Sequence, residues 1–305
     1  MPEASLIAID WGTTSARAYA LDHGGAIVAE RSAPLGVQRI TDGRFADALT
    51  SLCTGIGSES LPMIACGMIG SRQGWVEAPY RHCPADFSAI AMSLTRVQGT
   101  RLAIVPGLMC RDVDGVPDVM RGEETQVLGI LSEQRAERSV IVLPGTHSKW
   151  AIAGASGIER FSTFMTGELY AILRQQSILG RLAAEGSDDA ALDQGVRRSL
   201  RRSAALSHDL FSARTLVLAG ELAAQGVSDY LSGLLLGAEI ASALRWLERS
   251  GVNDKLEPIV VGEASLVARY RRALALAEID AMPGPVKAAA IGMWRIAKQA
   301  GMVRE

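Results

Sequence analysis

Residues 6–20 read LIAIDWGTTSARAYA, and residues 140–153 read VIVLPGTHSKWAIA. In each stretch an apolar run leads into a Gly-Thr-x-Ser turn, and a second strand follows the turn. The first turn covers residues 12–15 and the second covers residues 145–148. The chain therefore uses one β-hairpin pattern twice, which predicts two related halves.

The two Gly-Thr-x-Ser turns have the composition of phosphate-binding turns. Glycine lets the backbone approach a ligand closely, and successive amides together with Thr or Ser hydroxyls converge as donors on an anion. Tight β turns use the same residues for purely structural reasons, but the duplication favours the binding of a polyphosphate. The expected phosphate contacts are Gly12, Thr13, Thr14, Gly145 and Thr146, with Ser148 as a further candidate.

Strands alternate with helices along the rest of the chain, which is typical of an α/β protein. The expected strands are residues 61–66, 102–105 and 259–261, and the expected helices are residues 45–53, 123–138, 187–203, 234–248 and 286–300. A length of 305 residues suits two domains. We place them at residues 1–138 and 139–305, with hinges near residues 135–140 and within the final helix, which could return to the first domain.

The composition narrows the class of protein. Hydrophobic residues make up 48% and charged residues 21%, as in a compact protein, and the formal net charge of −2 offers no field for nucleic acid. The N-terminus lacks an export signal, and no apolar run reaches the roughly 18 residues that span a bilayer. We expect a cytoplasmic protein without membrane or nucleic-acid partners. Residues 234–248 are apolar enough for a homodimer contact, although burial within their own domain explains them equally well.

Five segments carry a resemblance to a known family. They are residues 10–15 (DWGTTS), 67–75 (GMIGSRQGW), 106–107 (PG), 120–126 (MRGEETQ) and 143–150 (LPGTHSKW). The two Gly-Thr turns and a late strand, glycine and helix are similar to the sugar kinase, Hsp70 and actin superfamily. Within it, the chain resembles the 2-dehydro-3-deoxygalactonokinase family over essentially its full length.

This resemblance implies an α/β fold of two actin-like, ribonuclease H-like lobes around an ATP cleft. It also implies a phosphotransferase with an alcohol acceptor, which uses ATP and Mg2+ to phosphorylate 2-dehydro-3-deoxy-D-galactonate at the 6-hydroxyl in galactonate catabolism. Two alternatives stay open. One is a kinase for another small acidic sugar, such as 2-dehydro-3-deoxy-D-gluconate, and the other is an actin-like scaffold that binds nucleotide without transferring phosphate.

Phosphoryl transfer needs positioning, charge neutralisation and a base near the attacking hydroxyl. The resemblance gives Asp10, at the end of the first strand, a role in holding magnesium, although a turn-capping aspartate would look the same. Glu124 and then Glu123 are the candidate bases, with Asp118 as a rival, although both glutamates would also suit a helix N-terminus. His147 has no orienting partner in the local sequence, so we do not expect a general base there.

The acidic substrate calls for an arginine, because its planar fork matches the two oxygens of a carboxylate. Arg72, beside Ser71 in a glycine-bounded loop, is the first choice and Arg121 is the second. Either could instead be a surface arginine paired with Glu77 or Glu123. Adenosine is expected where Gly262 and Glu263 precede a helix that begins near Ser265, although a plain strand-to-helix turn has the same pattern.

Overall fold

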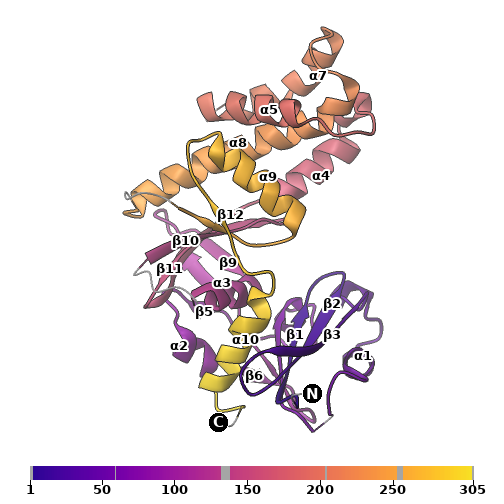
Figure 1. The fold of residues 1–305 in the computed structure, drawn as a ribbon, viewed down its shortest axis with the longest axis vertical. Coiled ribbons are helices and arrows are strands. Elements are labelled where there is room, and N and C mark those ends of the chain that lie inside the picture. The colour runs from indigo at the N-terminus through magenta and orange to yellow at the C-terminus, as the bar shows by residue number, and fades with distance from the viewer. Residues whose placement is uncertain (1–2, 59, 132–137, 203–204, 253–256, 304–305) are drawn as a thin grey trace. The chain divides into compact units, whose positions relative to one another are not determined.

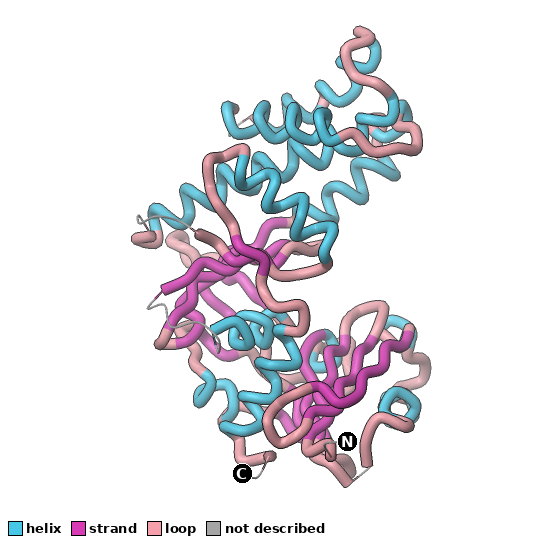
Figure 2. Tube along the Cα trace, viewed as in Figure 1, coloured by secondary structure: helices cyan, strands magenta, loops and turns pink. Residues whose placement is uncertain are grey.

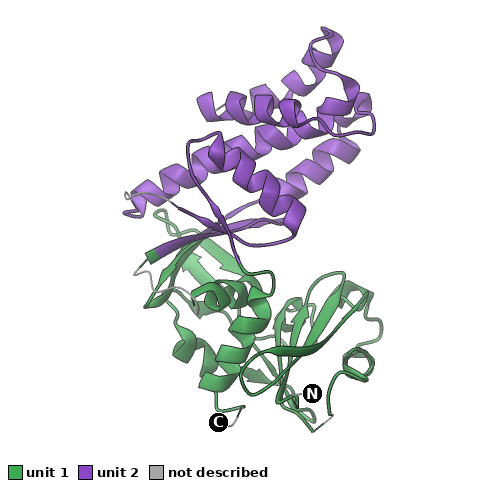
Figure 3. Cartoon of the chain, viewed as in Figure 1, with its two compact units in different colours: residues 1–138, 151–161, 285–305 green, residues 139–150, 162–284 purple. Residues whose placement is uncertain are grey.

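The structure is a computed structural model that describes residues 3–58, 60–131, 138–202, 205–252 and 257–303. The chain forms two compact units (Figure 3). Unit 1 contains Met1–Arg138, Ala151–Phe161 and Pro285–Glu305, and unit 2 contains Ser139–Trp150 and Ser162–Gly284. By compactness, therefore, the final helix groups with unit 1. The division into functional domains at residue 138 stays a prediction.

Unit 1 is built on a mixed six-stranded sheet (Figure 1) with the order β3-β2-β1-β4-β7-β6, beside a small sheet with the order β5-β8-β9. Its strands are β1 (Leu6–Trp11), β2 (Ala16–Leu21), β3 (Ile27–Ala33), β4 (Met63–Gly67), β5 (Arg81–His82), β6 (Thr95–Arg96), β7 (Leu102–Ile104), β8 (Leu108–Arg111) and β9 (Pro117–Met120). Its helices are α1 (Phe45–Cys53), α2 (Phe87–Ala91), α3 (Glu123–Leu131) and α10 (Ala288–Gln299). Strand β1 pairs antiparallel with β2 and parallel with β4.

A second sheet has the order β12-β11-β10-β13-β14. Its strands are β10 (Arg138–Leu143), β11 (Ser148–Gly154), β12 (Gly157–Phe164), β13 (Ile259–Val260) and β14 (Met282–Pro283). Strand β10 pairs parallel with β13, and β13 pairs parallel with β14. This order repeats that of β3-β2-β1-β4-β7, so the duplicated hairpin pattern is confirmed as a duplicated sheet topology.

The helices of unit 2 lie together on one side of its strands (Figure 2). They are α4 (Thr166–Gln176), α5 (Asp189–Arg201), α6 (Leu206–Leu210), α7 (Ser212–Leu218), α8 (Val227–Arg249) and α9 (Ala264–Ala275). Helix α8 begins seven residues before the expected start at residue 234. Its leading turns contain Asp229 and Gly233, which weaken the helical pattern in the sequence but are buried here against other helices.

Helix α8 also corrects the expectation about long apolar segments. Residues Ala224–Arg249 are long and apolar enough to cross a membrane by length and composition alone. However, 78% of the apolar window is buried inside the fold, as in the core helix of a globular domain. This burial accounts for the apolar residues 234–248 without a dimer contact.

The helix expected at residues 123–138 does not reach residue 138. Helix α3 is described as far as Leu131, and Arg138 already belongs to strand β10. The intervening residues 132–137, which include half of the expected first hinge at residues 135–140, lie outside the described part of the chain.

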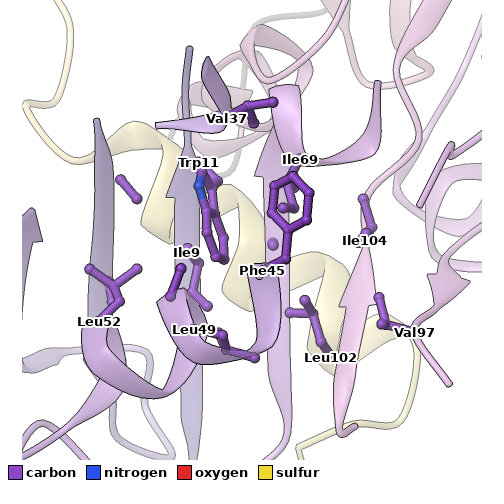
Figure 4. Packing of buried hydrophobic residues seen from close by; sticks show 14 of the residues in the cluster. Ile9, Trp11, Val37, Phe45, Leu49, Leu52, Ile69, Val97, Leu102 and Ile104 are labelled. Atoms are coloured by element: carbon purple, nitrogen blue, oxygen red, sulfur yellow. The ribbon is translucent and has the colours of Figure 1, made fainter. Parts of the chain in front are cut away.

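The core of unit 1 explains why the first hairpin forms at this position. Successive side chains of β1 point to opposite faces of the sheet. Ile9 and Trp11 pack with Phe45 and Leu49 of α1 (Figure 4). The Trp11 and Phe45 rings meet edge to face with centroids 6.3 Å apart. The Trp11 indole also donates a hydrogen bond of 2.7 Å to the Leu35 carbonyl. This packing fixes the end of β1, where the first Gly-Thr-x-Ser turn begins.

Helices α3 and α10 approach each other unusually closely within unit 1. A Cβ on Gly129 would lie 2.0 Å from the Ala288 carbonyl oxygen, and a Cβ on Gly292 would lie 1.9 Å from the Thr125 carbonyl oxygen. Only glycine fits at these two positions. The contact fixes the first turns of α3, which contain the candidate bases.

Candidate active site

The first Gly-Thr-x-Ser turn connects β1 to β2 in unit 1. The Gly12 amide donates to the Ser15 carbonyl at 2.9 Å, and the carbonyls of Gly12 and Thr13 accept from Val37 and Gln38. In the described part of the chain, the amides of Thr13 and Thr14 have no hydrogen-bond acceptor. The turn is thus held by its carbonyls and leaves two amides available to an anion.

Asp10 lies one residue before the end of β1, next to the turn. It is half-buried, and its register partner on β4 is Cys66. Burial raises the pKa of the Asp10 carboxyl, and the nearby Arg17 partly opposes this shift. A desolvated carboxylate in this place is a suitable group to hold a cation.

Two glycines bring the start of α3 to the end of β1. Gly67 has φ +90°, and a Cβ there would lie 2.7 Å from the Trp11 carbonyl oxygen. Gly122 has φ +105°, and a Cβ there would lie 3.2 Å from the Gly67 Cα. Both positions favour glycine by conformation and by space. The backbone therefore places the residues after Gly122 beside Asp10.

Side chains confirm this arrangement. The Cys66 sulfur lies 4.0 Å from Asp10 Oδ1, and the Thr125 hydroxyl lies 3.4 Å from the same sulfur. Burial raises the pKa of the Cys66 thiol well above its usual value, and the carboxylates of Asp10 and Glu124 add to the shift. The thiol thus stays protonated and connects Asp10 to the first turn of α3.

Glu124 is fully buried in this cluster. Its Oε2 accepts a hydrogen bond of 2.7 Å from the Gly122 amide, and its Oε1 has no partner among the described residues. Burial, and then repulsion from Glu123, raise the pKa of the Glu124 carboxyl to about 8. Glu123 is half-buried and accepts from the Arg121 amide at 3.0 Å. The structure brings both candidate bases to the Asp10 cluster, whereas Asp118 lies in the small sheet, opposite Cys110.

The two candidate arginines have different surroundings. The Arg72 side chain is 87% exposed and pairs with Glu77 at 3.0 Å, and the Ser71 hydroxyl donates to the Met68 carbonyl. This is the surface pairing that the sequence left open. Arg121 is held more firmly: it donates to the Ala78 carbonyl at 2.8 Å and lies 4.4 Å from the Tyr80 ring centroid.

The second Gly-Thr-x-Ser turn connects β10 to β11 in unit 2. The amides of Gly145 and Thr146 have no acceptor among the described residues, as in the first turn. The start of α4 packs on this turn, because a Cβ on Gly167 would lie 2.3 Å from the Gly145 carbonyl oxygen. His147 pairs with Glu168 of α4, an orienting partner that the local sequence did not indicate.

Ser148 faces away from solvent. Its hydroxyl lies 2.6 Å from the Tyr270 hydroxyl in a buried polar cluster, so it does not share the exposed surface of Thr146. The role of Ser148 as a direct phosphate contact stays a prediction, but the geometry favours a supporting role.

A cavity of about 240 Å3 opens beside the second turn within unit 2. It is lined by Gly145 of the turn, by Thr166, Gly167 and Tyr170 of α4, by Ser232, Leu235 and Leu236 of α8, and by Leu266, Arg269 and Tyr270 of α9. Apolar walls with a few polar groups are typical of a pocket for a small molecule or cofactor. The sequence pointed to the start of α9 but missed the lining residues on α4 and α8.

Gly262 and Glu263 precede α9 but do not line this cavity. The Glu263 carboxylate caps α9 by accepting from the amides of Ser265 and Leu266 at 3.1 and 3.4 Å. Its pKa is lowered, first by the hydrogen bond from the Ser265 hydroxyl. The plain strand-to-helix turn that the sequence left open thus describes these two residues, and an adenosine contact there stays a prediction.

Among the described residues, no group of three or more His, Cys, Asp or Glu side chains is placed to hold a metal ion. Mg2+ often binds through one or two carboxylates together with substrate phosphates and water. Asp10, with its desolvated carboxylate beside the first turn, fits that mode.

The duplicated sheet with its two Gly-Thr turns is an actin-like ATPase fold, and the relatives of the chain are phosphotransferases, which defines its class. The solved component A of (R)-2-hydroxyglutaryl-CoA dehydratase from Acidaminococcus fermentans is similar to this chain in fold alone. The TM-score is 0.51 at 11% identity, over 97% of this chain and 98% of that one.

The chain belongs to the 2-keto-3-deoxy-galactonokinase family, whose sequence model matches residues 10–296. It is 40% identical over 271 residues to the 2-dehydro-3-deoxygalactonokinase of Escherichia coli K12, covering 88% of this chain and 89% of the relative. A solved protein of Sinorhizobium meliloti assigned to the same activity has a TM-score of 0.85 at 34% identity, covering 96% of this chain and 98% of that one.

Proposed function

We propose that the chain is a cytoplasmic, Mg2+-dependent kinase that transfers the γ-phosphoryl group of ATP to the 6-hydroxyl of 2-dehydro-3-deoxy-D-galactonate in galactonate catabolism. The observation that carries this proposal is the family match over residues 10–296, which contains both turns, the acidic cluster and the cavity. The geometry supports it, because each part of the site has a function in phosphoryl transfer.

The cavity of unit 2 takes the adenosine part of ATP. Its volume of about 240 Å3 and its mainly apolar walls suit a purine base, while the hydroxyls and the Arg269 guanidinium provide polar contacts. The available amides of the two Gly-Thr turns donate to the phosphates. Mg2+, held by Asp10, would neutralise charge on the phosphates.

Glu124 takes the proton of the substrate hydroxyl. As the oxygen attacks the γ-phosphorus, the bond from phosphorus to the ADP oxygen breaks and the proton passes to the carboxylate. A base with a pKa of about 8 is well matched to this transfer near neutral pH. Glu123 and Asp118 stay rival bases.

The substrate carboxylate requires a cation, for which Arg72 and Arg121 remain the candidates, with the Ser71 hydroxyl as a further substrate contact beside Arg72. Arg72 is exposed and could exchange Glu77 for the substrate, at little cost for a surface pair. Arg121 has a fixed position near Glu123 and Glu124 and would act by local charge.

The test is coupled ATP turnover with 2-dehydro-3-deoxy-D-galactonate and with its gluconate epimer, for the wild type, Glu124→Gln and Glu123→Gln. We expect turnover with the galactonate compound and loss of at least about a hundredfold in kcat for Glu124→Gln. Loss in Glu123→Gln alone would move the base to Glu123. Tight ATP binding without turnover of either sugar acid would favour the scaffold and refute the substrate assignment.

A further inference from the structure

Helix α8 carries a buried carboxylate for which neither the turns nor the proposed chemistry accounts. Glu239 is 3% exposed and does not line the cavity of unit 2. Residues that do line the cavity hydrogen-bond to it from two other helices. An apolar side chain would fill this position without the free-energy cost of burying a carboxylate.

Four donors surround the Glu239 carboxylate. The Trp150 indole donates to Oε1 at 2.8 Å, and the Tyr270 hydroxyl donates to Oε2 at 2.9 Å. Hydroxyls of Thr166 and Ser148 complete the set. Because the Tyr270 proton goes to Glu239, the Ser148 hydroxyl is the donor in its contact with Tyr270.

These donors come from every element around the proposed nucleotide pocket. Thr166 begins α4, and Tyr270 lies on α9; both line the cavity. Ser148 is the last residue of the second Gly-Thr-x-Ser turn and the first of β11, and Trp150 follows on the same strand. One carboxylate on α8 therefore connects α4, α9 and the phosphate-binding turn.

Burying the Glu239 carboxylate costs free energy, so we look for a role of the cluster in the arrangement of the site. Burial is the largest influence on the pKa of Glu239 and raises it, while the four hydrogen bonds act against the shift. Among the described residues, none of the groups that influence this pKa is a cation. A buried polar network without charge compensation contributes specificity of arrangement more than stability, since apolar replacement is often neutral.

We infer that Glu239 is a positioning residue of the nucleotide site, which orients Tyr270 and Thr166 in the cavity wall and holds Ser148 beneath the second Gly-Thr-x-Ser turn. This inference rests on the proposed function, because it takes the cavity and the turn as the binding site of ATP. Glu239 acts through these three side chains and does not touch the nucleotide.

The test removes single hydroxyls of the cluster, because Tyr270→Phe and Ser148→Ala keep the shape of the core. Glu239→Gln keeps the size of the side chain but changes an acceptor into a donor. A matched control is Tyr230→Phe, since Tyr230 is also buried in unit 2 and its hydroxyl lies 2.8 Å from a serine hydroxyl, that of Ser212. Tyr230 does not line the cavity.

The readouts are the Kd of ADP by calorimetry, the KM for ATP, the KM for the sugar acid, kcat and the melting temperature. We expect Tyr270→Phe and Ser148→Ala to raise the Kd of ADP and the KM for ATP by about tenfold, the usual range for one buried hydrogen bond. The KM for the sugar acid should not change, and Tyr230→Phe should leave the nucleotide constants at the wild-type value.

Nucleotide constants equal to those of the wild type in both hydroxyl variants would overturn the inference and leave the proposed function intact. The same holds if Tyr230→Phe raises the KM for ATP as much as Tyr270→Phe does, because the effect would then be one of general stability. If the wild type binds no ADP, both the proposed nucleotide site and the inference fail. Should Glu239→Gln not fold, the two hydroxyl variants decide.

Discussion

Glu124 is the residue whose chemistry is set most clearly by its position. Its carboxyl is fully buried and has a pKa of about 8, so it is mostly protonated at pH 6. A general base acts only when deprotonated. We therefore expect kcat to rise about tenfold per pH unit below this pKa and to level off above pH 8. A pH–rate profile from 5.5 to 9 checks this, and a flat profile between 6 and 8 would contradict the assignment of the base.

The same pKa predicts a stability effect that does not depend on activity. The folded protein keeps a proton on Glu124 up to pH 8, whereas the unfolded chain releases it near the ordinary value of 4.5. The group therefore costs stability progressively as the pH rises from 4.5 to 8. Glu124→Gln should be more stable than the wild type by at least about 1 kcal/mol at pH 9, with a smaller gain at pH 6.

Urea unfolding of both proteins at pH 6 and pH 9 measures this difference. Glu185→Gln is a suitable control, because Glu185 is exposed in unit 2 and its replacement should change neither curve. If Glu124→Gln is less stable than the wild type at pH 9, the folded protein stabilises the charged Glu124 carboxylate. This result would contradict the raised pKa.

Sequence patterns located the residues whose partners lie nearby along the chain, and missed those with distant partners. Asp10 and Glu124 could be named as candidates because they stand at a turn and a helix start, which are local patterns, and because the family resemblance gave these patterns a role. Glu239 and Tyr270 could not, because their contacts join residues 31 and 122 positions apart along the chain. For the same reason, the partner of His147 was found only once α4 was seen to pack on the second turn.

At the scale of elements, the contact of α3 with α10 determines where the candidate bases lie. A methyl group on Gly129 would clash with the Ala288 carbonyl oxygen at 2.0 Å, so the helices would have to separate. We expect Gly129→Ala to lower the free energy of unfolding by about 1–3 kcal/mol, the usual cost of overpacking. It should also lower kcat at least about tenfold, because a shift of α3 displaces Glu123 and Glu124.

Gly195→Ala is the matched control for this prediction. It creates a similar clash, 2.3 Å from the Tyr230 carbonyl oxygen, at the contact of α5 with α8 in unit 2. Chemical denaturation should show comparable destabilisation, while kcat of the folded protein stays near the wild-type value. Equal kcat for both variants would mean that α3 does not position the base.

Element boundaries were predictable where the apolar periodicity is clear and less so elsewhere. Helix α1 begins and ends at the expected residues 45 and 53. The early start of α8 was missed because Gly233 looks like a helix breaker in the sequence, whereas Gly237 lies inside the expected helix. In the structure they permit α5 to pack closely, since a Cβ at either position would lie 2.2 or 2.6 Å from a carbonyl oxygen of α5. Close helix packing is a tertiary reason for glycine, which local propensity does not express.

For the whole molecule, the duplicated pattern predicted two related halves, and the family resemblance predicted the fold class. Two similar hairpins implied two similar sheets, and the two sheets share their strand order. No sequence pattern indicated that Ala151–Phe161, which covers the end of β11 and the start of β12, would group with unit 1 by compactness. Such grouping depends on contacts between distant segments.

The division of chemistry over the two units leads to a prediction about motion. The proposed base lies in unit 1 and the proposed nucleotide cavity lies in unit 2, so the proposed function assigns a part of the reaction to each unit. A kinase must also keep water from the γ-phosphate, which usually involves closure around the substrates. We expect small-angle scattering to give a smaller radius of gyration with a non-hydrolysable ATP analogue and the sugar acid together than with either alone. Tyr270→Phe should need a higher concentration of the analogue for the same change. If scattering curves with and without both ligands coincide at saturation, substrate-driven closure is excluded, and water must be kept out by local side-chain packing alone.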